Sequence, residues 1–356
     1  MTQLGDFLEV PPGPPGLTVV QEGPGADTRA ELAEVADGAG LRTVEVLAWR
    51  DLHDPEAGGS ELHAAEIAER WAAAGIDVTF RTSAVLGAPE EVDRDGYRVV
   101  RRGGRHLVFP RVVGRGLTGR VGRADGLVEI WNGMPFFSPV FARRARAVFL
   151  HHVHEEMWDM TLKPRALARF GQLIESRLAP PFYRRTPVVT LSASSRHEIV
   201  ELLGLPAENV TVVPPGVDRR FRPGGQRSVD PLVVAVGRLV PVKRLGMLVD
   251  ALHEVHQRHP RLRAVIAGEG YERDAVAARI AHHGAQDWIE LPGRVDDHQL
   301  VELYRQAWVV ASASAREGWG MTLTEAAACA TPSVASNIAG HRDAVVHGHS
   351  GLLFDD

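Results

Sequence analysis

The chain has 356 residues, a net charge of −5 and a single cysteine. This length favours two domains over one core, and the apolar and charged fractions of 44% and 24% are those of an ordinary globular protein. The negative charge argues against nucleic acid as the main partner, and a lone Cys329 excludes a disulfide framework. No apolar run reaches about 18 residues, so we expect no transmembrane helix and a cytoplasmic protein.

Residues 1–40 are predicted to be an N-terminal extension that is partly disordered. The run Pro11–Gly16 contains four prolines and two glycines, which neither a helix nor a central strand accepts. Ala26–Gly38 has the pattern of a short acidic helix. We assign no chemistry to this extension.

Strand and helix patterns alternate from residue 43 onward, which predicts parallel sheets with helices on both faces. A first series extends to about residue 213, and a loop rich in proline and glycine follows near residues 214–225. We therefore predict two Rossmann-like domains, 41–215 and 216–356. The expected strands are Thr43–Trp49, Asp77–Thr82, Leu127–Trp131, Ala147–His152, Val188–Ser192 and Val210–Val213, then Leu232–Gly237, Arg263–Gly268, Trp288–Leu291, Trp308–Ser312 and Ser333–Ala335. The expected helices with defined limits are Glu61–Ala74, Arg244–His259, Glu272–His283, Asp297–Gln306 and Met321–Ala330.

Two glutamates, Glu317 and Glu325, flank a glycine-rich turn between the last of these long strands and its helix. Backbone N–H groups from Gly318 to Leu323 are expected to point into the same crevice, because the first amides of a helix lack partners within it. One acid could hold the hydroxyls of a sugar and the other those of a ribose. The amides between them would hold phosphate.

Cations and glycines follow other strands of the predicted sheets. Arg238 and Lys243 come after the first strand of the second series, where two positive charges suit a diphosphate, although both could also be solvated loop charges. Gly58 and Gly59 precede a helix and allow a close backbone approach to an anion, although a plain turn explains them equally well. Gly268–Gly270 and the turn Leu291–Val295 could offer backbone groups to a base edge, or be ordinary turns.

Three histidines, His151, His152 and His154, end a strand of the first series. If the strand continues through them, His152 and His154 share one face and His151 lies on the other. We prefer a histidine that hydrogen-bonds a sugar hydroxyl to a zinc site, because no cysteine or paired acid completes a ligand set. A histidine on the surface or in the core remains the plain alternative.

The stretch from Arg98 to Arg123 holds eight arginines and no acid, and could face an anionic acceptor or a lipid surface as readily as solvent. The eight are Arg98, Arg101, Arg102, Arg105, Arg111, Arg115, Arg120 and Arg123.

Taken in order along residues 43–356, these motifs resemble those of the retaining glycosyltransferases of family 4, which have the GT-B fold. The resemblance is carried by the Gly58-Gly59 loop, Gly237-Arg238 with Lys243, Gly268-Glu269-Gly270, Leu291–Val295, the pair Glu317 and Glu325 around Gly-Trp-Gly, and the closing runs Ser336–Asp343 and Gly351–Phe354. Asp93-Arg94-Asp95 fits the metal motif of the other large glycosyltransferase fold, but does not follow a buried strand. We interpret it as a solvated turn.

The resemblance implies a role for each matching residue. Arg238 and Lys243 would bind the diphosphate of a nucleotide sugar, Glu317 would orient the donor sugar, and Glu325 would accept hydrogen bonds from the ribose. The remaining implied donor contacts are Gly58, Gly59, Gly268, Val295, Gly318, Gly320, Met321, Thr322 and Leu323. His154, or less favourably His152, matches the histidine near the reacting carbon.

The implied reaction is retaining transfer of a sugar from a UDP- or GDP-sugar to a glycan, lipid-linked or small-molecule acceptor, with no metal or other cofactor. Peripheral contact with the anionic inner face of a membrane is a further expectation. Chains of this family usually continue beyond the Gly-Leu-Leu-Phe strand with helices that close back on the first domain. We expect these to be missing here, which leaves open a nucleotide-sugar binding protein of impaired activity; a GT-B nucleotide-sugar epimerase is the other alternative.

Overall fold

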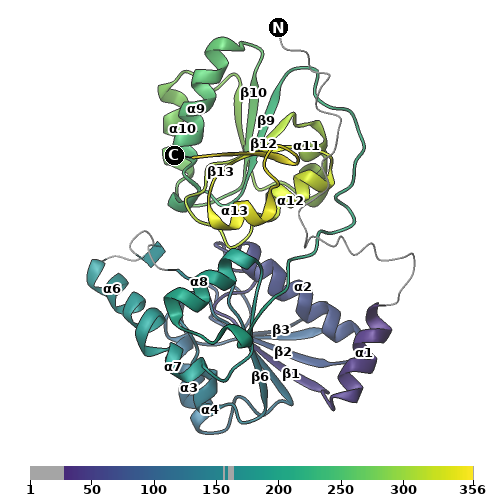
Figure 1. Cartoon of the computed structure of the whole chain (residues 1–356), viewed down its shortest axis with the longest axis vertical. Helices are drawn as coiled ribbons and strands as arrows, with labels where there is room; N and C mark the ends of the chain where they lie inside the picture. Colours follow the sequence, from purple (N-terminus) through teal and green to yellow (C-terminus); the bar gives the residue numbers. More distant parts are fainter. Residues whose placement is uncertain (1–27, 155–156, 159–163, 356) are drawn as a thin grey trace.

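The computed structural model describes residues 28–154, 157–158 and 164–355, and shows two α/β lobes, each built on its own sheet (Figure 1). The first sheet has the order β3-β4-β2-β1-β5-β6-β7-β8 and the second has the order β11-β10-β9-β12-β13-β14. Every strand pair in both sheets is parallel except β3 with β4. Alternating strands and helices produce this architecture because a parallel pair needs a crossover, usually a helix.

The first lobe begins with α1, Thr28–Gly38, within the helix expected from the sequence. Its strands are β1 Thr43–Leu47, β2 Asp77–Thr82, β3 Glu91–Arg94, β4 Tyr97–Arg101, β5 Gly126–Ile130, β6 Ala145–Phe149, β7 Val188–Thr190 and β8 Val210–Val212. Its other helices are α2 Gly59–Ala73, α3 Val108–Leu117, α4 Ser138–Phe141, α6 Arg165–Leu173, the π-helix η1 Ile174–Leu178, α7 Pro180–Tyr183, α8 Ala193–Leu203 and the 3₁₀ turn η2 Ala207–Asn209.

The second lobe repeats the pattern with six parallel strands. These are β9 Leu232–Val236, β10 Arg263–Ala267, β11 Ile289–Gly293, β12 Val309–Ser312, β13 Ser333–Ser336 and β14 Gly351–Phe354. The helices are the 3₁₀ turn η3 Pro241–Lys243, α9 Leu245–Arg258, α10 Arg273–His282, α11 Asp297–Gln306, α12 Met321–Ala328 and α13 Ala339–Ala344.

Each sheet is covered on both faces by apolar side chains. In the first lobe, α2 packs on one face around Val46 and Phe80, while α3 packs on the other around Leu47 and Leu127. Successive residues of a strand point to opposite faces, so Val46 and Leu47 enter different halves of the core. Strands buried in this way hold their carboxyl ends at one edge of each sheet, where loops carry the functional groups.

One predicted loop is a strand. The interpretation of Asp93-Arg94-Asp95 as a turn was wrong for its first two residues, which belong to β3 and pair antiparallel with β4. The turn itself is Asp95-Gly96, where both residues have positive φ, 47° and 83°. An Asp-Gly pair with this backbone is typical of a two-residue hairpin, so β3 forms the antiparallel edge of the sheet.

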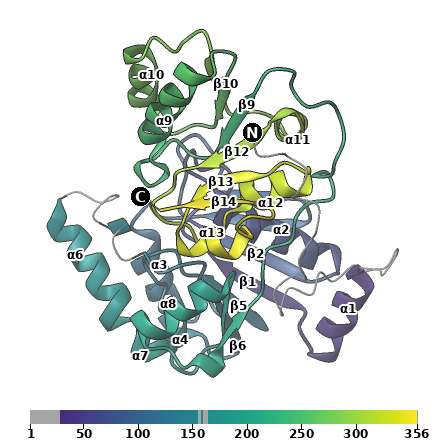
Figure 2. The same cartoon turned by 45° about the horizontal axis from the view of Figure 1, so that its top comes forward.

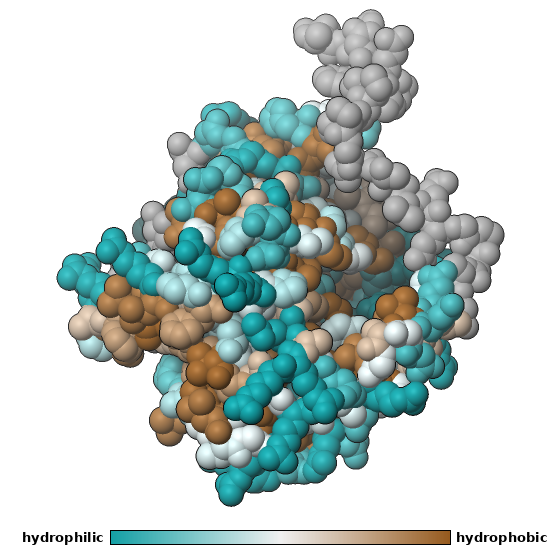
Figure 3. Space-filling model, turned by 60° about the horizontal axis from the view of Figure 1, so that its bottom comes forward, coloured by the Kyte–Doolittle hydropathy of each residue, from teal (hydrophilic) through white to brown (hydrophobic). Residues whose placement is uncertain are grey.

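The lobes meet through α2 and α8 of the first and α12 and α13 of the second (Figures 1 and 2). Contacts across this boundary include Ser194 Oγ with Asp343 and Arg316 Nη2 with Glu198 Oε2 at 2.8 Å. On the outer surface, exposed apolar side chains of α6, η1 and α7 gather at the left of Figure 3. They are Leu167, Phe170, Leu173, Leu178 and Phe182.

Candidate active site

The candidate site lies where the carboxyl ends of β9 and β12 face the start of α2. A Cβ atom added to Gly58 would lie 2.9 Å from Nε of Arg238, and one added to Gly59 would lie 3.1 Å from Sδ of Met321. The lack of side chains at these two positions therefore lets Arg238 and Met321 of the second lobe pack closely on the start of α2. The predicted Gly58-Gly59 and Arg238 do come together, from loops 180 residues apart in the chain.

Lys243 and Glu317 form an ion pair at the centre of the second-lobe side. Glu317 also accepts a hydrogen bond from Ser314 Oγ at 2.8 Å, and both side chains of the pair are only about one-fifth exposed, at 20% and 21%. Burial raises the pKa of Glu317, but the charge and hydrogen bond of Lys243 outweigh it and leave the pKa below its ordinary value. Glu317 is thus an ionised acceptor at neutral pH.

The loop that carries Glu317 is held by α13. A Cβ on Gly340 would lie 2.3 Å from the Glu317 carbonyl oxygen and 2.7 Å from that of Trp319, so only glycine fits there. The adjacent His341 is fully buried, and its Nδ1 lies 2.9 Å from the Ser336 carbonyl oxygen. The electrostatic interaction with His341 also lowers the pKa of Glu317. The closing run Ser336–Asp343 therefore shapes the site from behind.

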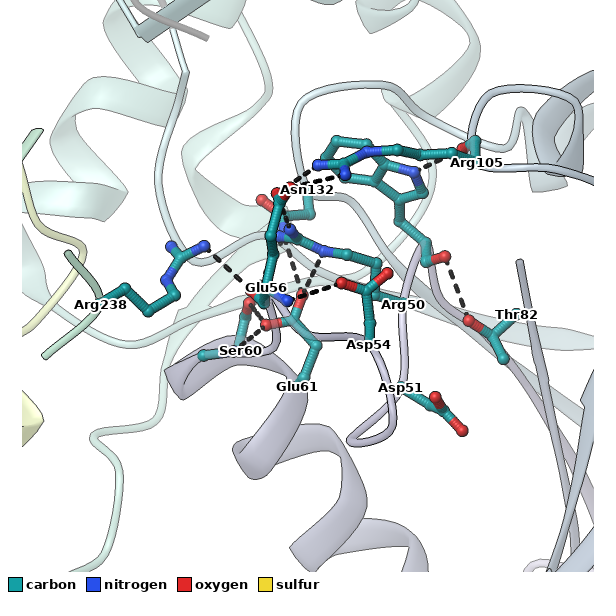
Figure 4. Close-up of polar contacts among 12 residues, drawn as sticks. Arg50, Asp51, Asp54, Glu56, Ser60, Glu61, Thr82, Arg105, Asn132 and Arg238 are labelled. Carbon is teal, nitrogen blue, oxygen red and sulfur yellow. Dashed lines mark hydrogen bonds and ion pairs between the residues drawn. The ribbon is translucent and has the colours of Figure 1, made fainter. Parts of the chain in front are cut away.

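Arg238 extends from the second lobe toward the first, and its Nη1 donates to the backbone oxygen of Glu56 at 3.1 Å (Figure 4). The Glu56 carboxylate is held in turn by Arg50, at 3.2 Å, and by two hydrogen bonds from Arg105. Those bonds hold the pKa of Glu56 below its ordinary value, although burial opposes them. Three arginines thus converge on one acidic residue at the boundary of the lobes.

The start of α2 is ordered by a second buried pair. Glu61 Oε2 accepts a hydrogen bond from Gly58 N at 2.8 Å, and Glu61 Oε1 lies 3.3 Å from Nε of Arg50. Ser60 Oγ also donates to Glu61, at 2.9 Å (Figure 4). A carboxylate at the third position that reaches back to the start of the helix is half of a capping box, and it fixes the Gly58-Gly59 backbone.

The three histidines follow β6, which ends at Phe149, so they lie in a loop and not in a strand as predicted. The rings of His152 and His154 still stack on one side, with centroids 4.7 Å apart, and His151 turns to His63 at 3.2 Å. Burial lowers the pKa of His152 to about 4 and that of His154 well below its ordinary value, and Arg316 and Arg238 contribute to both. Both rings are neutral at pH 7.

His152 faces the turn of Glu317, because a Cβ on Gly318 would lie 3.2 Å from its Nδ1. Behind the histidines, the buried Glu175 of the π-helix η1 accepts from the backbone N of His154 at 3.0 Å and from Nε1 of Trp158 at 2.6 Å. The histidine loop is therefore fixed by Glu175 on one side and meets the second lobe on the other, where Arg316 Nε donates to the Val153 carbonyl oxygen at 3.2 Å.

Glu325 lies apart from this group. It accepts a hydrogen bond from the Tyr304 hydroxyl at 2.8 Å, and burial raises its pKa, with Arg220 acting in the opposite direction. Arg220 and Asp297 also line a cavity of about 510 Å³ on this side of the second lobe. No contact of Glu325 with Arg238, Lys243 or Glu317 is found among the described residues.

The residues predicted to offer backbone groups to the donor also lie in different surroundings. Gly268 has φ 142°, and a Cβ there would lie 1.9 Å from the Gly237 carbonyl oxygen, so this glycine lets two strand-end loops touch. Its N–H donates to Gly293 O at 2.8 Å, and Val295 is half-buried against the core. The Leu323 amide donates to Gly320 O at 2.9 Å, which leaves the amides before it as the predicted phosphate donors. Those amides belong to Gly318, Gly320, Met321 and Thr322.

Two family models match the chain. "Glycosyltransferase Family 4" matches residues 57–221 and "Glycosyl transferases group 1" matches residues 217–356, so that together they span both lobes. The chain belongs to glycosyltransferase family 4. It is therefore an enzyme that transfers sugars, as the order of motifs predicted.

Relatives of this glycosyltransferase have several activities. It is 28% identical to the D-inositol 3-phosphate glycosyltransferase of Frankia alni over 84% of this chain and 82% of the relative. It is 32% identical to the glycogen synthase of Mycobacterium tuberculosis over 52% of this chain and 45% of the relative.

Solved structures confirm the GT-B fold of the glycosyltransferase. Sucrose-phosphate synthase from Thermosynechococcus elongatus superposes with a TM-score of 0.70 at 17% identity, over 88% of this chain and 85% of that one. Anabaena Alr3699/HepE in complex with UDP and glucose superposes with a TM-score of 0.66 at 20% identity, over 88% and 86%. At such identities the similarity concerns the fold alone.

Sequence reasoning missed several groups of the site in the glycosyltransferase. Ser314 could have been suspected because its hydroxyl lies three residues before Glu317. His341 belongs to the run Ser336–Asp343, which contributed to the family resemblance but was given no role. Arg50, Glu56 and Glu61 gave no signal, because their meaning depends on partners from other loops. Within the described residues, no group of three or more histidine, cysteine or acidic side chains could hold a metal ion.

Proposed function

We propose that this glycosyltransferase moves a sugar, with retention of anomeric configuration, from a UDP- or GDP-sugar to a glycan, lipid-linked or small-molecule acceptor. One observation carries the proposal: the ion pair of Lys243 and Glu317 stands beside the boundary where Arg238 reaches the Gly58-Gly59 loop. Two cations and an ionised carboxylate in one place suit a diphosphate joined to a sugar.

Lys243 and Arg238 would bind the diphosphate and stabilise the charge that develops on it as the sugar departs. Preorganised donors of this kind each contribute about 2.7–4 kcal/mol to a transition state. Glu317 would accept hydrogen bonds from the sugar hydroxyls, and its ionised state, maintained by Lys243, suits that role.

In the proposed step, the acceptor hydroxyl attacks the anomeric carbon on the face that the diphosphate leaves. The bond from that carbon to the phosphate oxygen breaks, the new glycosidic bond forms, and a phosphate oxygen takes the hydroxyl proton. His154 would hydrogen-bond the sugar as a neutral ring near the reacting carbon, with His152 the less favoured candidate. Its low pKa supports a hydrogen-bonding role over that of a charged catalyst.

Glu325 would accept from the ribose hydroxyls, and Gly268 and Val295 would meet the base through their backbone. Glu325 is half-buried and already accepts one hydrogen bond, from Tyr304, so it is oriented for a second. The nucleotide complex of Alr3699/HepE supports UDP as a first candidate. We also propose that no metal is needed, because Lys243, Arg238 and the first amides of α12 can take over the role of stabilising a leaving diphosphate.

The acceptor and location belong to the same proposal. The names of the relatives suggest inositol 3-phosphate and glycogen as acceptors to be tried. We propose a cytoplasmic enzyme with peripheral contact to anionic membrane, supported by the exposed Arg120 and Arg123 of the arginine stretch. None of the described helices has the length and apolar character needed to cross a bilayer.

The test follows nucleoside diphosphate release from UDP- and GDP-sugars, with and without inositol 3-phosphate or glycogen. Acceptor-dependent release and a product with the donor's anomeric configuration, read by NMR, support the proposal. Inversion at the anomeric carbon contradicts the retaining step. Binding of nucleotide sugars without release under any condition supports a binding protein of impaired activity.

A further inference from the structure

A second basic site lies in the first lobe, between α3 and the sheet. Here Arg81 of β2, Arg98 of β4 and Arg102, which directly follows β4, face the helix, while α3 contributes Arg111 and Arg115. They line a cavity of about 380 Å³, within the range of small-molecule sites. None of these residues belongs to the donor site described above.

The charges in this cavity are not balanced. Arg81 pairs with the buried Glu45, and Arg98 and Arg102 share Glu91, with Glu90 at 3.1 Å from Arg102. The part of the chain that the structure describes offers Arg111 and Arg115 no carboxylate. Since these two arginines are four residues apart on one helix, their like charges repel one another.

This arrangement is unusual for the space between a helix and a sheet. The neighbouring part of the same layer is apolar, with Val108 and Val112 of α3 buried in the core around Leu47. Arg81, Arg98 and Arg102 already have carboxylate partners, and Glu91 itself lines the cavity, so the excess positive charge is that of Arg111 and Arg115. A bound anion would relieve the repulsion between these two. The valines Val100 and Val121 form an apolar wall beside them, which suits a ligand with both charged and uncharged parts.

We propose that the cavity beneath α3 binds a small phosphorylated molecule, with Arg111 and Arg115 as its principal ligands. Guanidinium groups bind phosphate oxygens in pairs, and a volume of about 380 Å³ accommodates a diphosphate or a sugar phosphate. The inference does not depend on the proposed donor or acceptor, because it uses no residue of that site.

The experiment measures binding of inorganic pyrophosphate to the full chain by titration calorimetry at fixed salt. The variant Arg111→Gln/Arg115→Gln should weaken the assigned binding by about tenfold or more, since hydrogen bonds to charged groups are the strong ones. The matched control is Arg120→Gln/Arg123→Gln, which removes two exposed arginines of the same stretch that do not line the cavity. It should bind pyrophosphate as the parent chain does.

Pyrophosphate could also enter the donor site, so Arg238→Ala is measured in parallel. Binding that survives Arg238→Ala and is lost in Arg111→Gln/Arg115→Gln supports the cavity. Equal weakening in both arginine pairs would show a diffuse basic surface and overturn the proposal, as would binding lost only with Arg238. Affinity for vesicles of anionic phospholipid without affinity for pyrophosphate would also overturn it. Because Arg111 is exposed, we expect the Arg111→Gln/Arg115→Gln variant to remain folded. A thermal melt of the variant checks this.

Discussion

The two sides of the candidate site, one on each lobe, are built in different ways. On the second-lobe side, Lys243, Ser314 and Glu317 lie in loops that follow β9 and β12, which are adjacent parallel strands. On the first-lobe side, Arg105 and Glu56 are 49 residues apart in loops that are held together by contacts between side chains, chiefly their own ion pair. The comparison teaches that sheet topology assembles the first group, whereas side-chain pairing assembles the second. We therefore expect substitutions in the first group to reduce activity much more than substitutions in the second.

The largest expected effect is that of Lys243→Ala. The substitution removes a cation from the proposed diphosphate site and leaves Glu317 buried without its partner. We expect turnover to fall by about 10²–10³-fold, measured as nucleoside diphosphate release at saturating donor. Lys243→Arg retains the charge and should lose less. Unchanged turnover in the alanine variant would remove the second-lobe side from catalysis.

A smaller loss is expected at Glu325, which lies apart from the ion pair. Glu325→Ala should weaken nucleotide binding by about tenfold with a smaller effect on turnover, because a lost hydrogen bond to a charged group is worth about 1.5–3 kcal/mol. Tyr304→Phe removes only the hydroxyl that orients this carboxylate. It should reduce the free energy of nucleotide binding by about 0.5–1.5 kcal/mol. Calorimetry with UDP and GDP measures both. Equal affinity in all three proteins would contradict the ribose assignment.

The histidine loop gives a pH test of the first-lobe side. Burial holds the pKa of His152 at about 4, below its ordinary 6.5. As the pH falls, the unfolded chain is therefore protonated at this histidine before the folded chain is. Stability is then retained above about pH 6.5 and lost as the pH falls toward 4, by up to about 1.4 kcal/mol per pH unit. His152→Asn should flatten this slope in urea unfolding curves. The exposed His197→Asn serves as the control and should leave the slope as it is.

The smallest effect is expected at Glu56. Its partner Arg105 is 44% exposed, and pairs of this kind contribute about 0.2–1 kcal/mol. Its other partner, the buried Arg50, keeps Glu61 as a carboxylate partner when Glu56 is changed. Glu56→Gln should therefore change the free energy of unfolding by less than about 1 kcal/mol and turnover by a few-fold at most. A loss comparable to that of Lys243→Ala would show that side-chain pairing on the first-lobe side is as important as the strand ends.

Much of the fold could be predicted because it depends on local patterns. β2 and α11 have the predicted limits, and the other predicted strands and helices are shifted by few residues. The edge strand β3 was missed because three of its four residues are charged, a composition that resembles a turn until the antiparallel partner is known. The histidine loop was extended as a strand because its apolar neighbours continue the pattern past Phe149.

The arginine stretch shows where prediction from sequence ended. As a sequence it is one basic segment, but the structure divides it among different places. Arg101 is buried and pairs with Asp51, Arg105 pairs with Glu56 near the boundary of the lobes, and Arg111 lines the cavity beneath α3. These destinations depend on contacts between residues up to 50 positions apart, which no periodicity encodes.

The sequence by itself determined the family, the order of strands and helices, and the strand ends that carry Lys243, Glu317 and Arg238. It could do so because strand, turn and helix signals are local and parallel strands place their carboxyl ends at one edge. Only the tertiary structure decided which charged groups meet: Lys243 with Glu317, Arg238 with the Glu56 backbone, and Arg111 and Arg115 with the cavity beneath α3. The physical reason is that burial and pairing of charge are properties of the space between elements.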